Sequence, residues 1–187
     1  MKTNTSVRPQ GRAKPLQDRT KTRISIVSAV GPNGELIEPI FDPEKKRVRL
    51  SVWRNQSAVT LDSYSPDDAT RYVPAKNLGS LIKHGVLRLP SAPAEYGDVG
   101  DLLTAVRAHI DRYVDVTEEF SCLAAHYVLL TWVYDQFREL PYLRRRGDYG
   151  TGKTRFLSGI GSLCYKPIFA GGASTVSPLF RMLHQIR

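Results

Sequence analysis

The sequence contains, without a gap, Gly147-Asp148-Tyr149-Gly150-Thr151-Gly152-Lys153-Thr154, and this stretch decides the fold expected around it. It matches Gly-x-x-x-x-Gly-Lys-Thr, the phosphate-binding loop known as Walker A. Glycines let the backbone curl so that successive N–H groups point at a β-phosphate. A helix that follows the loop adds the partial positive charge of its N-terminus. We therefore predict an open anion-binding loop that leads into a helix starting near Lys153.

Each residue type in the loop has an expected task. Lys153 would reach the β- and γ-phosphates, and the Thr154 hydroxyl would ligate Mg²⁺ through the nucleotide. The predicted nucleotide-binding residues are Gly147, Asp148, Tyr149, Gly150, Thr151, Gly152, Lys153, Thr154 and Arg155. ATP and Mg²⁺ are the expected cofactors. The alternative is a glycine-rich turn that binds no nucleotide.

The flanks of the loop favour the order strand, loop, helix. A short apolar run at 142–143 precedes the loop, and apolar residues follow at helical spacing from Phe156. A central parallel strand is normally apolar on both faces, so the run Arg144, Arg145 and Arg146 is unusual at this position. A further strand is predicted at 167–170 and a last helix at 176–186. Residues 141–187 therefore read as the opening β-α-β-α of a P-loop NTPase parallel sheet.

The chain before the loop divides into three parts. Residues 1–23 are polar and basic and predict a disordered arm. Residues 24–98 predict a small β-rich domain. Apolar residues from Ile24 to Val30 lead into a turn at 31–34 and then into a second apolar run at 36–41, which predicts a β-hairpin. After a turn at 42–45, apolar residues at 48, 50 and 52 alternate with polar residues at 47, 49 and 51, which predicts a strand with one buried face. A proline-containing, loop-rich extension is predicted from 57 to 96. Residues 99–140 predict a two-helix segment. The fold class is α/β, or α+β overall.

The two helices of this segment have clear signals. In the first, Asp101 is placed to cap or charge the N-terminus of a helix with apolar residues at helical spacing. In the second, Thr117 with Glu118 and Glu119 predicts a helix start. That second helix is apolar on nearly every face, so we expect it to be buried between layers and to stop at Pro141.

Charge and composition narrow the class of protein. The 187 residues carry a net charge of +9, with 41% hydrophobic and 24% charged residues, which is an ordinary globular balance. The positive charge lies at the ends: residues 1–23 hold seven basic residues against one acid, and residues 144–187 hold eight against one. This distribution predicts nucleotide and DNA as partners. For the first 23 residues, a solvated tail is an equal alternative.

Cysteine content and hydropathy exclude other classes. Two cysteines, Cys122 and Cys164, form neither a disulfide framework nor a CxxC metal site. The longest uncharged apolar stretch that could be helical, from Phe120 to Tyr134, has 15 residues, fewer than the roughly 20 that cross a bilayer. No apolar segment of a secretory signal follows the N-terminus. We expect a soluble, cytoplasmic protein with no membrane partner.

The chain from about Leu102 to Leu183 resembles helicase- or primase-associated P-loop ATPases of phages, plasmids and integrated mobile elements. The resemblance is carried by Ile110 to Val114, Thr131 to Asp135, Pro141 to Leu143, Gly147 to Thr154, Gly171 to Thr175, and Phe180-Arg181. It implies an ATPase core, preceded by helices, that acts in DNA replication or transfer. A homo-oligomer is implied if the core is complete.

One departure from this family pattern concerns catalysis. Such ATPases carry a Walker B acid on a later strand, but no Asp or Glu follows Asp148 in this sequence. The sequence thus predicts the N-terminal part of such an ATPase, truncated within the core, which binds ATP weakly and is inactive alone. The alternative is a non-catalytic, basic nucleic-acid-binding protein. A small nucleotide or metabolite kinase is a third candidate, which the missing acids disfavour.

Overall fold

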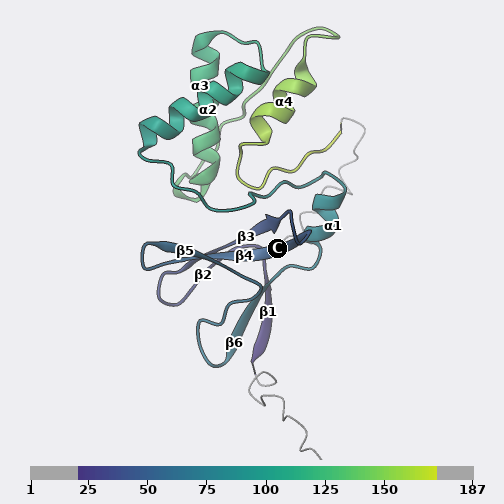
Figure 1. Cartoon of the computed structure of the whole chain (residues 1–187). Coiled ribbons are helices and arrows are strands. Elements are labelled where there is room, and N and C mark those ends of the chain that lie inside the picture. Colours follow the sequence, from purple (N-terminus) through teal and green to yellow (C-terminus); the bar gives the residue numbers. More distant parts are fainter. Residues whose placement is uncertain (1–20, 172–187) are drawn as a thin grey trace, which may run out of the picture.

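The computed structural model describes residues 21–171 and shows a mixed α/β fold. Figure 1 shows the strands of the N-terminal half on one side and three helices of the C-terminal half grouped on the other. The predicted arm lies outside the described residues except for its last three positions, where the first strand already begins at Thr22. The predicted last helix at 176–186 also lies outside them.

The strands form two sheets within the described residues. The strands are β1 (Thr22–Ile26), β2 (Ala29–Val30), β3 (Leu36–Asp42), β4 (Arg47–Arg54), β5 (Ser57–Leu61) and β6 (Thr70–Pro74). Strands β2, β3, β4 and β5 form an antiparallel sheet in that order, and β1 pairs with β6 in parallel. The predicted hairpin is confirmed at β2 and β3, where Gly34 has a φ of +81° and its N–H donates to Gly31 O at 3.0 Å.

The predicted strand at Val48 to Val52 is confirmed as part of β4. Leu50 and Val52 are fully buried and pack in a core with Ile26, Ile37 and Tyr64. Residue 51, expected on the polar face, is buried as well. The sequence also placed residues 24–26 in the hairpin, and this was wrong. They form β1, whose partner β6 comes from the extension that was expected to be mostly loop.

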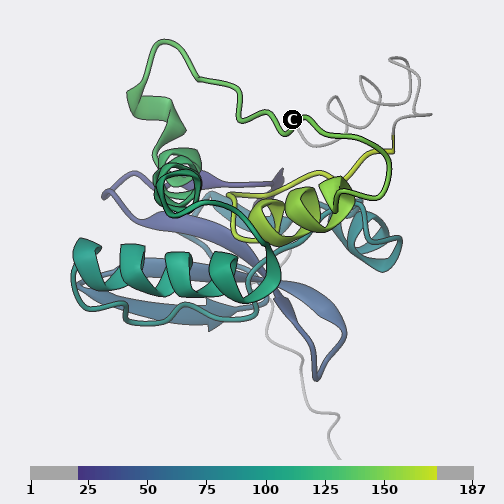
Figure 2. The same ribbon diagram turned by 90° about the horizontal axis from the view of Figure 1, so that it is seen from above.

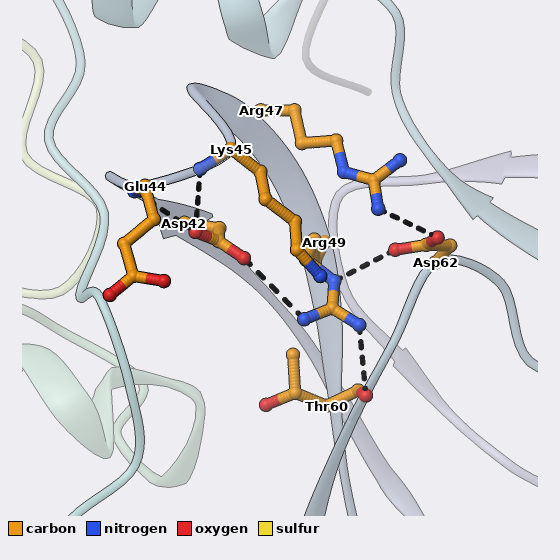
Figure 3. Close-up of polar contacts among 7 residues, drawn as sticks. All are labelled: Asp42, Glu44, Lys45, Arg47, Arg49, Thr60 and Asp62. Carbon is orange, nitrogen blue, oxygen red and sulfur yellow. Dashed lines mark hydrogen bonds and ion pairs between the residues drawn. The ribbon is translucent and has the colours of Figure 1, made fainter.

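Ionic contacts join the end of β3, the start of β4 and Asp62, which follows β5 (Figure 3). Arg49 Nε donates to Asp62 Oδ1 at 2.7 Å, and Arg47 Nη2 contacts Asp62 Oδ2 at 2.8 Å. The hydrogen bond from Arg49 lowers the pKa of Asp62. The Asp42 carboxylate accepts hydrogen bonds from the backbone N–H groups of residues 44 and 45, and these bonds form the predicted turn at 42–45. The Arg47–Asp62 ion pair is about half exposed, so it fixes local geometry and contributes little to stability.

Glu35 is a buried carboxylate at the start of the β3 region. It accepts hydrogen bonds from the Tyr64 hydroxyl at 2.6 Å and from the Asn33 backbone N–H at 3.0 Å. The Tyr64 hydroxyl first, and then the Asn33 side chain, lower the pKa of Glu35 from 4.5 to about 2. The carboxylate therefore joins the hairpin turn to the isolated bridge between Tyr64 and Tyr72.

Acid is expected to destabilise the β-rich part through Glu35. Because the folded-state pKa lies below the unfolded one, the stabilisation is complete above about pH 4.5 and is lost as the pH falls toward 2. The measurement is the free energy of unfolding by urea at pH 7 and pH 3, for the wild type and for Glu35→Gln. The loss between the two pH values should be smaller in the variant, and an equal loss would contradict this assignment.

The helices are α1 (Leu78–Lys83), α2 (Val99–Tyr113), α3 (Glu118–Trp132), the 3-10 turn η2 (Tyr134–Gln136) and α4 (Lys153–Gly161). Both predicted helices of the central segment are confirmed. The cap of α2 is Asp98, whose carboxylate accepts from Asp101 N at 2.8 Å, so Asp101 lies in the first turn. Thr117 caps α3 as expected, accepting from Phe120 N.

The expectation that the second helix is buried all round was wrong. One face of α3 packs on α2 and α4 through Ala124, Ala125 and Val128. Figure 2 shows these three helices from above. The opposite face is open among the described residues, where Leu123 is 57% exposed and His126 is also exposed. The helix also ends at Trp132, well before the proline expected to stop it.

The parallel sheet expected after the helices is not formed within the described residues. Residues 141–146 form no strand. The Arg145 guanidinium of this segment lies over the Phe156 ring. At 167–170, Ile168 makes only an isolated antiparallel bridge with Leu87. A strand needs a neighbour to pair its N–H and C=O groups, and no described segment lies beside 141–146 to supply one. The helix between them is confirmed as α4.

Candidate phosphate-binding loop

Residues 147–152 form an irregular loop that ends on α4. Gly150 and Gly152 have φ values of +81° and +74°, a region that favours glycine. Gly152 is the cap residue of α4, and the helix begins at Lys153 as the motif predicts. Thr151 closes the loop, because its backbone N–H and its hydroxyl both donate to Asp148 O, at 3.4 and 2.9 Å. The predicted helix start at Lys153 is therefore confirmed, and anion binding by the loop stays a prediction.

The ammonium of Lys153 folds back over the loop. Its Nζ donates to Gly147 O at 2.7 Å and to Asp148 O at 2.6 Å. An ammonium has three N–H donors, so one remains for an external acceptor. The carbonyl groups of Gly147 and Asp148 thus hold the Lys153 ammonium against the loop. Among residues 21–171, no carboxylate forms an ion pair with this ammonium.

The N-terminus of α4 lacks the internal partners that the other long helices have. No side chain caps it, and its first turn contains no acid. By contrast, Asp98 caps α2 and Thr117 caps α3, and both helices carry acids in the first turn. The first N–H groups of a helix have no intrahelical acceptor, and an anion satisfies them. The structure leaves these donors of α4 to solvent or to a ligand.

The remaining predicted site residues lie at the rim of the loop. Tyr149, Thr154 and Arg155 are exposed. Gly147 is restricted by space, because a Cβ there would meet Thr151 Oγ1 at 2.7 Å. Thr154 lies in the first turn of α4, and its contact with a nucleotide-bound Mg²⁺ stays a prediction. Within residues 21–171, no group of three His, Cys, Asp or Glu side chains could hold a metal by itself.

The core of the helical part anchors α4 and so positions the loop. Phe156 is 2% exposed, with its ring 5.6 Å from that of Phe120 between centroids. Ile160, one turn further, is buried in the same cluster with Val106 and Ile110. Because these contacts come from α2 and α3, the loop sits on a packed helix rather than on a mobile end.

Sequence reasoning missed a polar cluster at the other end of α4. Lys166 Nζ donates to Glu38 Oε2 at 2.7 Å, to Tyr165 Oη at 2.6 Å and to Val27 O at 2.9 Å. The Tyr165 hydroxyl donates to Glu38 Oε1 at 2.9 Å. Burial lowers the pKa of Lys166 and raises that of Tyr165. No sequence signal could have found this pairing, because 127 residues separate Glu38 from Tyr165.

Two cavities adjoin that cluster, and neither is at the loop. Their volumes are about 420 and 140 Å³, and both are lined by Tyr165 and Lys166. A loop that binds phosphate through backbone N–H groups needs no deep cavity, so we assign the candidate phosphate site from the motif and the donors.

The comparisons with known proteins add no family to this geometry. No family model matches the chain, and neither the curated proteins nor the solved structures give a significant match. Among the described residues, no helix is long and apolar enough to cross a membrane.

Proposed function

We propose that residues 147–155 bind the triphosphate of Mg-ATP, in a protein similar to the helicase- or primase-associated P-loop ATPases of mobile elements. The observation that supports this most is the pair of left-handed glycines, Gly150 and Gly152, which turn the backbone onto the uncapped start of α4. Lys153 adds its ammonium at the same place. A structural turn would not need two left-handed glycines, an uncapped helix and an inward-folded cation together.

The charge around the loop supports an anionic ligand. Arg144, Arg146 and Arg155 are exposed close to the loop in sequence, and Asp148 is the only acid from 144 to 187. Positive charge without compensating acids attracts phosphate, on a nucleotide or on a nucleic acid. DNA is accordingly the proposed macromolecular partner. The second candidate function, a non-catalytic nucleic-acid-binding protein, rests on these same arginines and does not need the glycine geometry.

Equilibrium binding of three ligands tests the proposal. If the loop recognises a β-phosphate, Mg-ATP should bind, inorganic pyrophosphate should compete with it, and AMP should not. Isothermal titration with ATP and displacement of a fluorescent ATP analogue provide the two measurements. Equal binding of AMP and ATP would mean that the loop does not read the β-phosphate, and binding of DNA without any nucleotide binding would favour the second candidate.

Hydrolysis by the chain of residues 1–187 is expected to stay at background, with or without DNA. The loop supplies phosphate donors, but the described residues offer no acid cluster to order Mg²⁺ and no placed base for water. Phosphate release measured over many turnovers checks this. Turnover that depends on Lys153 would show that an acid from another part of the chain or from a second copy completes the site.

A further inference from the structure

The larger cavity lies at the junction of the two halves of the molecule. Val27 and Ser28, between β1 and β2, form one wall. The end of α3, the η2 turn and Tyr165 form the others. Figure 1 shows this junction at the end of α4 nearest the strands, whereas the loop of 147–152 lies at the far end. No residue from 147 to 155 lines the cavity, so we treat the cavity and the loop as two separate places.

The lining of the cavity is aromatic and has polar edges. Tyr127, Tyr134 and Tyr165 line it, and the rings of Tyr134 and Tyr165 lie 5.9 Å apart with an angle of 31° between their planes. Among the described residues, the hydroxyls of Tyr127 and Tyr134 make no hydrogen bond, so they are available at the edge of the cavity. At about 420 Å³, the volume lies within the range of about 300–1,000 Å³ usual for small-ligand sites.

The cavity offers no free charge to its occupant. Lys166 is the only charged residue in its lining, and all three of its N–H donors are taken by Glu38, Tyr165 and the Val27 carbonyl. The carboxylate of Glu38 neutralises it at 2.7 Å. A phosphate or a carboxylate would therefore gain nothing here. A flat, uncharged ring with hydrogen-bonding edges would stack on the tyrosines and reach their hydroxyls.

Positive charge begins where the chain leaves the cavity. Leu140 and Pro141 line it, and Arg138, Arg144 and Arg146 on the same segment are exposed with no ion pair among residues 21–171. Between residues 135 and 146, the sequence contains four arginines and two acids, Asp135 and Glu139, so the segment carries a net positive charge. A neutral aromatic cavity with guanidinium groups beside it matches a base attached to a phosphodiester backbone.

We propose that the junction cavity binds a nucleobase, stacked on Tyr134, and that this site is separate from the loop at 147–154. A free nucleoside and an unpaired base of a single strand share this ring chemistry. The exposed arginines favour the strand, because a nucleoside has no phosphate for them to contact.

The probes are adenosine and thymidine, which have no phosphate, and a fluorescein-labelled oligothymidylate. The signal for the nucleosides is the fluorescence of Trp132, whose indole lies 5.3 Å from the Tyr165 ring between centroids. The chain contains two tryptophans, so Trp53→Phe removes the other emitter. Tyr134→Ala is the test variant, Tyr134→Phe keeps the ring, and Tyr96→Ala is the control because Tyr96 is exposed outside the cavity.

We expect Tyr134→Ala to weaken binding by about 5- to 150-fold, with Tyr134→Phe and Tyr96→Ala near wild type. If both the nucleosides and the oligothymidylate bind, the base alone is sufficient for binding at the cavity.

If only the oligonucleotide binds and Tyr134→Ala weakens it, the site belongs to a single strand. Arg144→Ala should then reduce the slope of log K against log salt concentration by about 0.7. Absence of binding by every probe, or binding that Tyr134→Ala leaves unchanged, would overturn the proposal. Lys153→Ala should leave nucleoside binding unchanged, so the two sites can fail separately.

Discussion

Lys153→Ala is expected to abolish measurable binding of Mg-ATP. The substitution removes the cation that we propose contacts the terminal phosphates, and it also removes the two hydrogen bonds to Gly147 O and Asp148 O. A hydrogen bond to a charged group contributes about 1.5–3 kcal/mol, which corresponds to roughly 10- to 150-fold in affinity. Because the wild-type affinity is expected to be weak, a loss of this size leaves nothing to measure by titration.

The control for this experiment is Lys76→Ala, which removes an exposed lysine far from the loop in sequence. Circular dichroism melting of both variants should match the wild type, since the loop is exposed and α4 is anchored by its buried face. If Lys153→Ala binds Mg-ATP as well as the wild type, the loop is a structural turn. Salt-dependent DNA binding that persists in this variant would then favour the nucleic-acid-binding alternative.

Phe156→Ala is expected to destabilise the helical part by about 3–5 kcal/mol. The Phe156 side chain is 2% exposed and packs on the Phe120 ring and under the Arg145 guanidinium. Its removal leaves a cavity among α2, α3 and α4. A domain of this size has only about 5–15 kcal/mol of stability in total, so the loss is large. Urea unfolding measures it.

Leu157→Ala is the matched control, because Leu157 is the next residue of α4 and is 58% exposed. Its cost should stay within about 0.5 kcal/mol. We also expect Phe156→Ala to weaken Mg-ATP binding, since the buried face of α4 positions the loop. Equal stability of the two variants would mean that α4 does not pack as described, and the anchoring of the loop would have to be revised.

Much of the loop and of the helices could be predicted because their causes are local. Gly150 and Gly152 adopt positive φ for a steric reason that acts within one residue, and α4 begins directly after them. Thr117 caps α3 through the N–H of Phe120, three residues away. The turn at 31–34 forms because a glycine stands where φ must be positive. In each case the stabilising contact spans only a few residues.

The errors concern contacts between distant segments. Residues 24–26 look like a hairpin strand, but they pair with 72–74, more than forty residues later. The face of α3 that is left open depends on where α2 and α4 lie, which apolar composition does not encode. Residues 142–146 precede the loop as a strand would, yet an isolated extended segment has no ladder partner. The end of α3 at Trp132, earlier than the expected stop at Pro141, likewise depends on tertiary contacts.

The sequence alone therefore determined the left-handed glycines of the loop and the start of α4 at Lys153, because short-range sterics decide them. The tertiary structure decided what the chain brings together around Tyr165 and Lys166. Glu38 from β3 and the Val27 carbonyl reach these residues only because the two halves fold against each other. Contacts between residues more than a hundred positions apart follow from packing and charge neutralisation in three dimensions. No local sequence pattern predicts them.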